Sequence, residues 1–252
     1  LINIKDTAHT MKTVLITGAS SGIGLQLAND YLDNGCRVLA CGRDQNKLEK
    51  VLHHVNVQYC VFDTQNMTQI ESSLESVLQP DLVILNAGNC EYVDDAHQLD
   101  ARMFDRVFST NVMGTVNCLS VLLPKMKHGS HLAIVSSSVT FLPLTRAEAY
   151  GASKAALDYL TKTLSVDLKD VGIDVSLIRP GFVDTPLTRL NDFPMPGTIS
   201  VEKASQMIRR GLDKRKLEIN FPFIFILILR VLSWLPSSWW QVIAVKMRHQ
   251  SL

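Results

Sequence analysis

The chain carries no clear excess of charge of either sign. Its 252 residues include 25 Lys and Arg against 24 Asp and Glu, which gives a formal net charge of +1. Proteins that bind nucleic acids usually gather a basic excess on one face, so we expect no nucleic-acid partner. With 46% apolar and 19% charged residues, the composition is typical of a folded globular chain with a sizeable core.

The sequence also lacks a disulfide framework and a metal-binding pattern. The five cysteines are odd in number and form no Cys-x-x-Cys pair, so we expect neither paired disulfides nor a thiolate zinc site. This cysteine usage is typical of a reducing compartment, and we expect a cytoplasmic protein. The seven histidines fall into no ligand spacing with carboxylates, and we therefore expect no bound metal.

Internal repeats, low-complexity tracts and linkers are absent as well, so the sequence gives no reason to divide the chain into several domains. Residues 1–10 lack the apolar run of a secretory signal, and Met11 directly precedes the first strand-like run. We expect residues 1–10 to be an extension and Met11 to be the natural start. Residues 11–218 are then one domain, and residues 219–252 are an apolar C-terminal extension packed on or beside it.

From Met11 onward, short apolar or β-branched runs alternate with longer segments of helical period. The runs are nearly continuous, which is typical of strands that helices cover on both faces of a parallel sheet. The predicted strands are residues 13–17, 37–41, 58–62, 82–85, 132–136 and 174–178, and the predicted helices are residues 22–32, 45–53, 67–78, 102–123, 150–169 and 201–215. We therefore predict an α/β fold: a doubly wound, mostly parallel sheet of six or seven strands with helices on both faces, and ligands at the carboxyl ends of the strands.

The first predicted strand runs into the glycine-rich segment TGASSGIG, Thr17 to Gly24, and then into a helix. Its glycines allow a tight turn and a close approach of the backbone to a pyrophosphate, whose charge the N-terminus of the helix stabilises. An ordinary glycine-rich turn is the alternative, but the flanking strand and helix favour a dinucleotide site. The residues of this segment that we expect to bind the cofactor are Gly18, Ser20, Ser21, Gly22, Ile23 and Gly24.

The second predicted strand is followed by Gly42, Arg43 and Asp44. An acidic side chain at this place commonly binds a free ribose 2′-hydroxyl, whereas a 2′-phosphate requires its absence and a nearby arginine. Because Gly42 occupies the expected acidic position and Arg43 follows it, we expect NADP rather than NAD, with Ser20 or Ser21 donating a further hydrogen bond to the phosphate. Asp44 is the alternative ribose ligand, although we favour it as the N-cap of the helix that follows.

Polar and small residues follow the next two predicted strands. Asp63 could accept a hydrogen bond from the adenine amino group, or could instead cap the helix that begins near residue 67. Asn86, Ala87 and Gly88 include small residues that let a ribose and an adenine ring pack closely above the sheet. Each signal is weak alone, but their places at successive carboxyl ends of strands favour one cofactor site.

A tyrosine, a lysine and a serine form the most specific constellation. Tyr150 and Lys154 lie four residues apart at the start of a predicted helix, so both side chains project from one face. An ammonium beside a phenol lowers the tyrosine pKa from about 10 toward neutrality, which suits a general acid/base. Ser137, in the serine run after the fifth strand, could hold a carbonyl oxygen. The Asn111 amide could bind a relay water, or Asn111 could simply be a satisfied polar residue of a helix.

In this order and on these elements, the motifs resemble those of the short-chain dehydrogenase/reductase superfamily, in its compact single-domain branch. The resemblance spans residues 12–216 and is carried by TGASSGIG, by Asn86 to Gly88, by Asn111, by the serine run at residues 136–138, by YGASK at Tyr150 to Lys154 and by RPGFVDT at Arg179 to Thr185. It implies a Rossmann fold and a nicotinamide cofactor.

The resemblance also implies a catalytic tetrad of Asn111, Ser137, Tyr150 and Lys154. The usual spacing of thirteen residues between the serine and the tyrosine selects Ser137, while Ser138 remains open. In the implied roles, Lys154 lowers the Tyr150 pKa and holds the nicotinamide ribose, Ser137 orients the substrate carbonyl, and Asn111 supports a relay water. The residues implied to hold the nicotinamide carboxamide are Pro180, Gly181, Val183 and Thr185.

The implied protein is an NADP(H)-dependent carbonyl reductase or alcohol dehydrogenase that acts on a small carbonyl or alcohol substrate. The main alternative is a catalytically silent dinucleotide-binding regulatory protein, against which the intact Ser137, Tyr150 and Lys154 argue. A nucleotide-sugar epimerase would be expected to have a different glycine spacing and a larger substrate-binding portion.

After Lys216 the chain departs from the family pattern. Residues 218–221 could form a seventh strand, and the apolar run 223–229 is too short to span a bilayer, which takes about 20 residues. We consider three interpretations of this tail. It is buried packing or a subunit interface of a homo-oligomer, an amphipathic element in a membrane interface with Trp234, Trp239 and Trp240 at headgroup level, or an apolar wall for a lipophilic substrate. Buried packing is the most frequent fate of an apolar helix.

Overall fold

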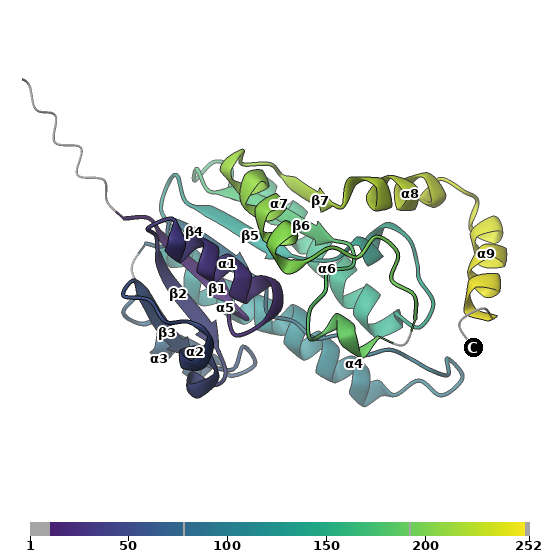
Figure 1. Ribbon diagram of the computed structural model, residues 1–252, viewed down its shortest axis with the longest axis horizontal. Coiled ribbons are helices and arrows are strands. Elements are labelled where there is room, and N and C mark those ends of the chain that lie inside the picture. Colours follow the sequence, from purple (N-terminus) through teal and green to yellow (C-terminus); the bar gives the residue numbers. More distant parts are fainter. Residues whose placement is uncertain (1–10, 78, 192, 250–252) are drawn as a thin grey trace, which may run out of the picture.

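The apolar runs of the sequence form the strands of one parallel sheet (Figure 1). The strands are β1 (Thr13–Thr17), β2 (Arg37–Gly42), β3 (Val57–Val61), β4 (Leu82–Leu85), β5 (His131–Val135), β6 (Asp174–Pro180) and β7 (Glu218–Phe221). Their order is β3-β2-β1-β4-β5-β6-β7, and every neighbouring pair is parallel. The predicted doubly wound α/β fold is confirmed. The strand order reverses between β1 and β4, which places a crevice at the carboxyl ends of these strands.

The computed structural model describes residues 11–77, 79–191 and 193–249. The predicted extension at residues 1–10, the last position of the helix predicted over 67–78, and residues 250–252 of the tail lie outside these described residues. The helices are α1 (Gly22–Asp33), α2 (Gln45–Val51), α3 (Met67–Leu74), α4 (Ala101–Phe108), α5 (Gly114–Leu122), α6 (Glu148–Asp167), α7 (Val201–Asp213), α8 (Phe223–Ser233) and α9 (Ser237–His249). Short helical turns lie at Leu123–Lys125, Ser138–Phe141 and Thr188–Leu190.

Helices cover both faces of the sheet, because successive strand residues point to opposite sides. Val14 and Ile16 of β1 belong to a buried cluster that includes residues of α1, α2 and α7. Leu15 belongs to a second cluster on the other face, which includes residues of α3, α5 and α6. Figure 1 shows α1 and α7 side by side over one face. The near-continuous apolar strands therefore bury both of their faces, as predicted.

Element boundaries differ from the predicted ones in places. The sequence predicts β1 and β4 to the residue, and the ends of β2, β3, β5 and β6 within two residues. The helix predicted over residues 102–123 is confirmed as one continuous helical stretch, Ala101–Lys125, but a π-helical turn at Ser109–Met113 that the sequence did not predict lies between α4 and α5. Such a turn inserts an extra residue into the helical repeat, and apolar spacing alone does not reveal it.

The stretch Ala101–Lys125, which includes this turn, is the one helical segment of the described residues with the length and hydropathy of a membrane span. Its Cys118, Leu119 and Leu122 are buried in the cluster beneath α3 and α6. These contacts identify the segment as a core helix of the fold. All five cysteines fall within the described ranges, where they are free thiols.

The tail continues from β7 as α8 and α9, which lie at one edge of the molecule (Figure 1). Leu229 of α8 and Trp240 of α9 are buried in a small cluster with Leu142. The Trp240 indole also donates a hydrogen bond to the carbonyl oxygen of Pro143, at 2.8 Å. Each tail helix is therefore docked on the body of the protein through one of its faces.

Candidate active site

A cavity of about 330 Å³ opens at the carboxyl ends of the strands. Segments after six of the seven strands and the first turns of α6 contribute to its lining. The predicted residues that line it are Gly18, Ser20, Ser21, Gly22, Ile23, Arg43, Asp63, Asn86, Ala87, Gly88, Ser137, Tyr150, Lys154, Pro180, Gly181, Val183 and Thr185. Of the predicted site residues, Gly24 and Asn111 lie behind this lining and support it.

The glycine-rich segment makes a tight turn from β1 into α1. Gly18 and Gly22 have φ angles of 68° and 54°, in the left-handed region that glycine enters without steric cost. A Cβ at Gly24 would lie 2.3 Å from the Gly18 carbonyl oxygen, so this close packing requires glycine. Ser21 is the N-cap residue of α1, but its side chain makes no capping hydrogen bond. The backbone N–H groups at the start of α1 suit a bound anion such as a pyrophosphate.

Thr17 ties this turn to the segment that follows β4. Its hydroxyl oxygen accepts hydrogen bonds from the backbone N–H groups of Asn86 at 2.9 Å and Ala87 at 3.0 Å. The Asn86 side chain donates in return to the Thr17 carbonyl oxygen, at 3.1 Å. At Gly88 a Cβ would lie 3.0 Å from the side-chain oxygen of Asn111. The small residue at Gly88 therefore lets the segment lie close to Asn111 and Lys154.

Two basic side chains lie at the β2 end of the cavity. Arg43 and Lys47 both line it. The exposed Arg43 guanidinium lies 4.0 Å from the Asp63 carboxylate, which also lines the cavity. Gly42 lines the cavity between them, and no carboxylate occupies its position. The arrangement supplies positive charge where the sequence predicted a 2′-phosphate.

Helix capping separates the roles of the nearby carboxylates. Asp44 accepts a hydrogen bond from the Lys47 backbone N–H at 3.1 Å and so caps α2, which confirms the preferred interpretation of Asp44. Asn66 caps α3 through a hydrogen bond from Gln69 N. The capping alternative for Asp63 is therefore wrong, because the helix begins three residues later than its carboxylate would require.

Tyr150 and Lys154 project from the start of α6 into the same end of the cavity. The Lys154 ammonium nitrogen lies 5.8 Å from the centre of the Tyr150 ring and donates to the Val135 carbonyl oxygen, at the end of β5, at 3.0 Å. The Ser137 hydroxyl hydrogen-bonds to Tyr150. Ser137 lines the cavity, whereas Ser138 is buried in the short turn that follows. The structure thus brings Ser137 rather than Ser138 to the tyrosine.

Burial sets the protonation states of these groups. It raises the pKa of Tyr150 far above its ordinary value; the neighbouring Cys90 thiol raises this pKa further, and the hydrogen bond with Ser137 lowers it. Burial lowers the pKa of Lys154 to about 8, against smaller raising effects of Cys90 and Asp158. The predicted lowering of the Tyr150 pKa is therefore wrong for this arrangement, because desolvation has the largest effect on it. The phenol is protonated at neutral pH and can act as a proton donor.

Asn111 is fully buried on the π-helical turn at Ser109–Met113. Its side-chain amide donates to the Asn89 carbonyl oxygen at 3.0 Å and to the Ser153 hydroxyl at 2.9 Å, and its side-chain oxygen accepts from Asn89 N at 2.8 Å. Both amide hydrogens are used within the protein. The expectation that this amide binds a relay water is therefore corrected. Asn111 instead ties the segment after β4 to α6, one residue before Lys154.

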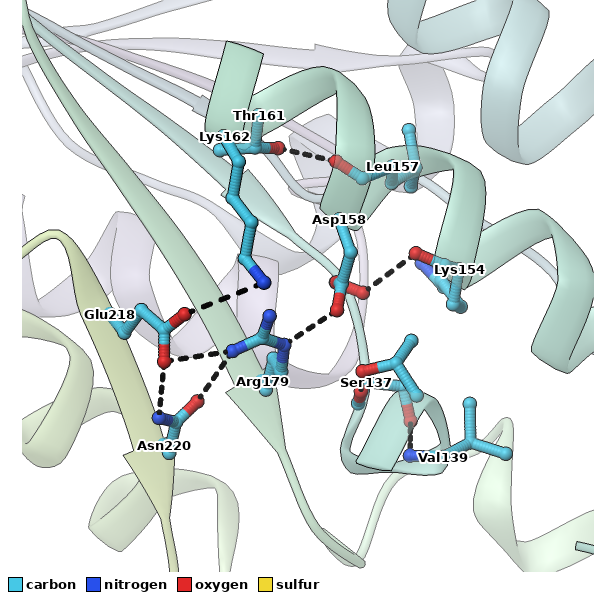
Figure 2. A network of polar contacts seen from close by, with 12 residues as sticks. Ser137, Val139, Lys154, Leu157, Asp158, Thr161, Lys162, Arg179, Glu218 and Asn220 are labelled. Carbon is cyan, nitrogen blue, oxygen red and sulfur yellow. Dashed lines mark hydrogen bonds and ion pairs between the residues drawn. The ribbon is translucent and has the colours of Figure 1, made fainter. Parts of the chain in front are cut away.

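A network of charges around the buried Arg179 guanidinium lies behind Lys154 (Figure 2). The Arg179 guanidinium, whose side chain is 3% exposed, contacts the carboxylates of Asp158 at 2.7 Å and Glu218 at 3.0 Å. Lys162 also approaches Glu218, at 3.9 Å. Asp158 lies one turn after Lys154 on α6, so the network fixes α6 against β6 and β7.

An aromatic row leads from the tail to the tyrosine end of the cavity. The Phe225 ring of α8 lies 5.5 Å from that of Phe182, which lies 6.2 Å from Phe193, and Phe193 lies 5.3 Å from Tyr92. Tyr150 is close enough to Tyr92 to be one of the causes that raise the pKa of Tyr92, after burial and Cys90. This side of the site is therefore apolar and aromatic.

Sequence reasoning missed several residues of the lining. They are Thr17, Cys41, Lys47, Phe62, Thr64, Gln65, Asn89, Thr110, Val135, Ser136, Pro186, Leu187 and Thr188. Most are within three residues of a predicted one, and a rule that counts every residue at a strand end would have found them. Lys47 required the helix boundary, because its place in the first turn of α2 follows from the cap at Asp44.

Comparison with known proteins agrees with this geometry. The short chain dehydrogenase family matches residues 12–192. An uncharacterized oxidoreductase of Myxococcus xanthus is 32% identical over 248 residues, which cover 94% of this chain and 98% of that protein. The dehydrogenase/reductase SDR family member 7B of Danio rerio is 29% identical over 202 residues, which cover 74% of this chain and 64% of that protein.

Solved structures share the fold. A short chain dehydrogenase from Burkholderia cenocepacia in complex with NADP has a TM-score of 0.81 at 24% identity, covering 89% of this chain and 93% of that one. A 3-ketoacyl-(acyl-carrier-protein) reductase from Brucella melitensis complexed with NADH has a TM-score of 0.74 at 22% identity, covering 83% and 96%. At these identities the likeness is one of fold.

Replacing Lys154 by Met should change how stability depends on pH. The folded-state pKa of about 8 lies below the ordinary lysine value of 10.5, so the unfolded chain binds more protons between these values. The free energy of unfolding of the wild type, relative to Lys154→Met, should therefore rise with pH from about 8 to 10.5. Urea unfolding across this range measures it. The exposed Lys203→Met variant should show no such trend, and a pH-independent difference for Lys154→Met would contradict the buried ammonium.

Replacing Asp158 by Asn should destabilise the fold by about 2 kcal/mol, because a buried guanidinium loses one of its carboxylates while Glu218 remains. The matched control is Asp184→Asn, whose ion pair with Arg189 is exposed and should contribute less than about 1 kcal/mol. Urea denaturation of the three proteins gives the comparison. Equal, small losses for both variants would show that the network does not hold α6 in place.

Proposed function

This chain belongs to the short-chain dehydrogenase family, and from that premise we propose that it is an NADP(H)-dependent oxidoreductase that interconverts a carbonyl and an alcohol. Tyr150 is its general acid/base. The observation that carries the proposal is the meeting of Tyr150, Lys154 and Ser137 in the same cavity as the glycine-rich turn. A dinucleotide site alone would serve a regulatory protein as well, whereas a positioned proton donor serves a reaction.

The residues of the cavity fit a dinucleotide. Gly18 and Gly22 line the cavity in left-handed conformations that bring the backbone to its wall. Gly24 packs against the Gly18 carbonyl oxygen behind them, and the N-terminus of α1 favours a negative charge beside this turn. When bound, the cofactor supplies the hydride in reduction and accepts it in oxidation. The protein binds it, orients the substrate and handles the proton.

In reduction, the carbonyl oxygen of the substrate lies against the Ser137 hydroxyl and the Tyr150 phenol. As the carbonyl carbon gains a hydride, the oxygen takes the phenolic proton and the product is an alcohol. The Lys154 ammonium stabilises the phenolate that remains. In oxidation, the phenolate takes the proton from the alcohol. Burial of Tyr150 keeps the phenol protonated at neutral pH, which is the form that donates the proton in reduction.

Preference for NADP is supported by the charge at the β2 end of the cavity. Arg43 and Lys47 offer two cations to a 2′-phosphate, and Gly42 leaves out the carboxylate that a free ribose would favour. The similar protein from Burkholderia cenocepacia binds NADP, while that from Brucella melitensis binds NADH. The preference therefore depends on the residues of this chain.

A lipophilic substrate is supported by the other end of the cavity. The charged residues of the lining are Lys154 at the tyrosine and Arg43, Lys47 and Asp63 at the β2 end. Tyr92, at one end of the aromatic row, lies near Tyr150, and Leu187 lines the cavity. Among the described residues Lys154 is the one cation of the lining at this end, and Arg146, 5.8 Å from the centre of the Tyr92 ring, is paired with Asp94 at 2.6 Å, so we propose an apolar aldehyde or ketone, or the corresponding alcohol.

Tyr150→Phe should lower turnover by about 10²–10⁴-fold, because it removes the general acid and keeps the ring. NADPH affinity should stay within about twofold of wild type. The assay is NADPH consumption over a panel of aldehydes, ketones and quinones, with NADPH binding followed by its fluorescence. Tyr159→Phe, at an exposed position on α6, is the control and should behave as wild type. Unchanged turnover of Tyr150→Phe would remove the proposed acid.

Arg43→Ala should weaken NADPH binding by about tenfold or more and leave NADH binding nearly unchanged, because a charge-assisted contact to the 2′-phosphate is lost. The matched control is Arg37→Ala at the opposite end of β2, which should alter neither affinity. Fluorescence titration with the two cofactors measures the ratio. Equal losses for NADPH and NADH would contradict the phosphate assignment.

A further inference from the structure

The outer face of α8 is apolar and exposed. Its exposed large apolar residues are Phe223, Ile224, Leu227, Ile228 and Val231, and Trp234 follows as the C-cap residue; their spacing places them along one side of the helix. The two most exposed of these residues are Trp234, at 83% of full exposure, and Phe223, at 74%. Ile226 and Leu229, on the opposite side, are buried. One face of the helix therefore packs against the protein, and a second apolar face points outward.

α9 extends this outer surface. Trp239, Val242, Ile243 and Val245 are exposed on it, while Trp240 is buried and anchored to Pro143. We call the ten exposed apolar residues of α8 and α9 the tail face. A monomeric soluble protein rarely leaves so many large apolar side chains exposed on two consecutive helices without a function. Figure 1 shows both helices at one edge of the molecule, where a broad surface could meet them.

The charge of the tail has one sign. Residues 219–252 contain three of the 25 Lys and Arg residues and none of the 24 Asp and Glu residues. Arg230 is paired with Glu218 at 3.3 Å. Lys246 is exposed, and it lies one turn after Val242 and Ile243 on the tail face. A cation set among exposed apolar side chains suits a surface that is apolar within and anionic outside.

We propose that the tail face binds the surface of an anionic lipid bilayer. The apolar side chains enter the boundary between headgroups and acyl chains, the tryptophans lie at headgroup depth, and Lys246 faces anionic headgroups. With 11 residues, α8 is about 16 Å long against a hydrocarbon core of about 30 Å, so it lies in the interface. The protein is then a peripheral membrane protein with its α/β body outside the bilayer.

A second copy of the chain is the competing occupant. In a two-fold contact the same face meets itself, so Lys246 would enter an interface to which the tail of neither copy brings an acidic residue that could pair with it. An anionic bilayer offers the opposite charge and an apolar interior together. The charge pattern therefore favours the bilayer, and the dimer is an outcome that the experiment distinguishes.

Vesicle flotation of the full chain tests the proposal. The probes are phosphatidylcholine vesicles with and without a minority of phosphatidylglycerol. The wild type should float with the anionic vesicles and more weakly with the neutral ones. An Ile224→Ser/Trp234→Ser double variant should bind about tenfold more weakly or worse. Lys246→Gln should lose about fivefold on anionic vesicles only.

Matched controls place the effect on the tail face. Tyr159→Ser removes an aromatic side chain that is 79% exposed on α6, and Lys203→Gln removes an exposed cation on α7; both should float as wild type does. NADPH binding by every variant reports a folded protein, and it separates a failure of this proposal from a failure of the proposed function. If the wild-type protein does not float with the anionic vesicles, the proposal is wrong. A wild-type dimer that the double variant converts to a monomer without any change in flotation also overturns it.

Discussion

The burial of the Lys154 ammonium is the constraint on which the rest of the site depends. A charge in this position is tolerated only where polar atoms surround it, and the Val135 carbonyl oxygen supplies one at the end of β5. Gly88 makes room for it, because a Cβ there would lie 3.4 Å from the ammonium nitrogen. Asn111 and Ser153 fix the neighbouring turn of α6, while Asp158 contributes a negative charge from the next turn. Tyr150 is buried in the same place beside Ser137, and its own burial keeps the phenol protonated.

Much of the fold and of the candidate site could be predicted from the sequence, because the patterns that mark them lie within short stretches of the chain. Continuous apolar runs gave the strands that helices cover on both faces, and the glycine-rich turn gave the position of α1 and hence the anion site. The four-residue spacing of Tyr150 and Lys154 was enough to place both side chains in one cavity.

The rest depended on contacts that join distant segments. The π-helical turn in the predicted helix 102–123 accompanies the burial of Asn111 against Asn89 and Ser153. The direction of the Tyr150 pKa was wrong because spacing reveals a neighbouring charge but not desolvation. The Arg179–Asp158 pair unites residues 21 positions apart, and no local pattern marks them as partners.

The tail was expected to be buried packing, a membrane-interface element or an apolar wall of the site, and its inner and outer faces differ in this respect. Its inner face is buried packing, through Leu229, Trp240 and their cluster, and Phe225 reaches the cavity loop, where a Cβ at Gly181 would lie 2.9 Å from its ring. Its outer face remains exposed. One segment therefore supports the loop beside the reacting groups and carries the surplus apolar surface. A cytoplasmic location and a homo-oligomeric state stay predictions.

The claim that this protein transfers a hydride between a nicotinamide cofactor and a carbonyl carbon is tested most directly by following a deuterium label. The protein is incubated with NADPH that carries deuterium at the transferable position of its nicotinamide, together with apolar aldehydes and ketones, and the products are analysed by mass spectrometry. The account predicts an alcohol with one deuterium on the former carbonyl carbon for each NADPH consumed. Tight NADPH binding without deuterium in any product would contradict it and identify a dinucleotide-binding protein without turnover.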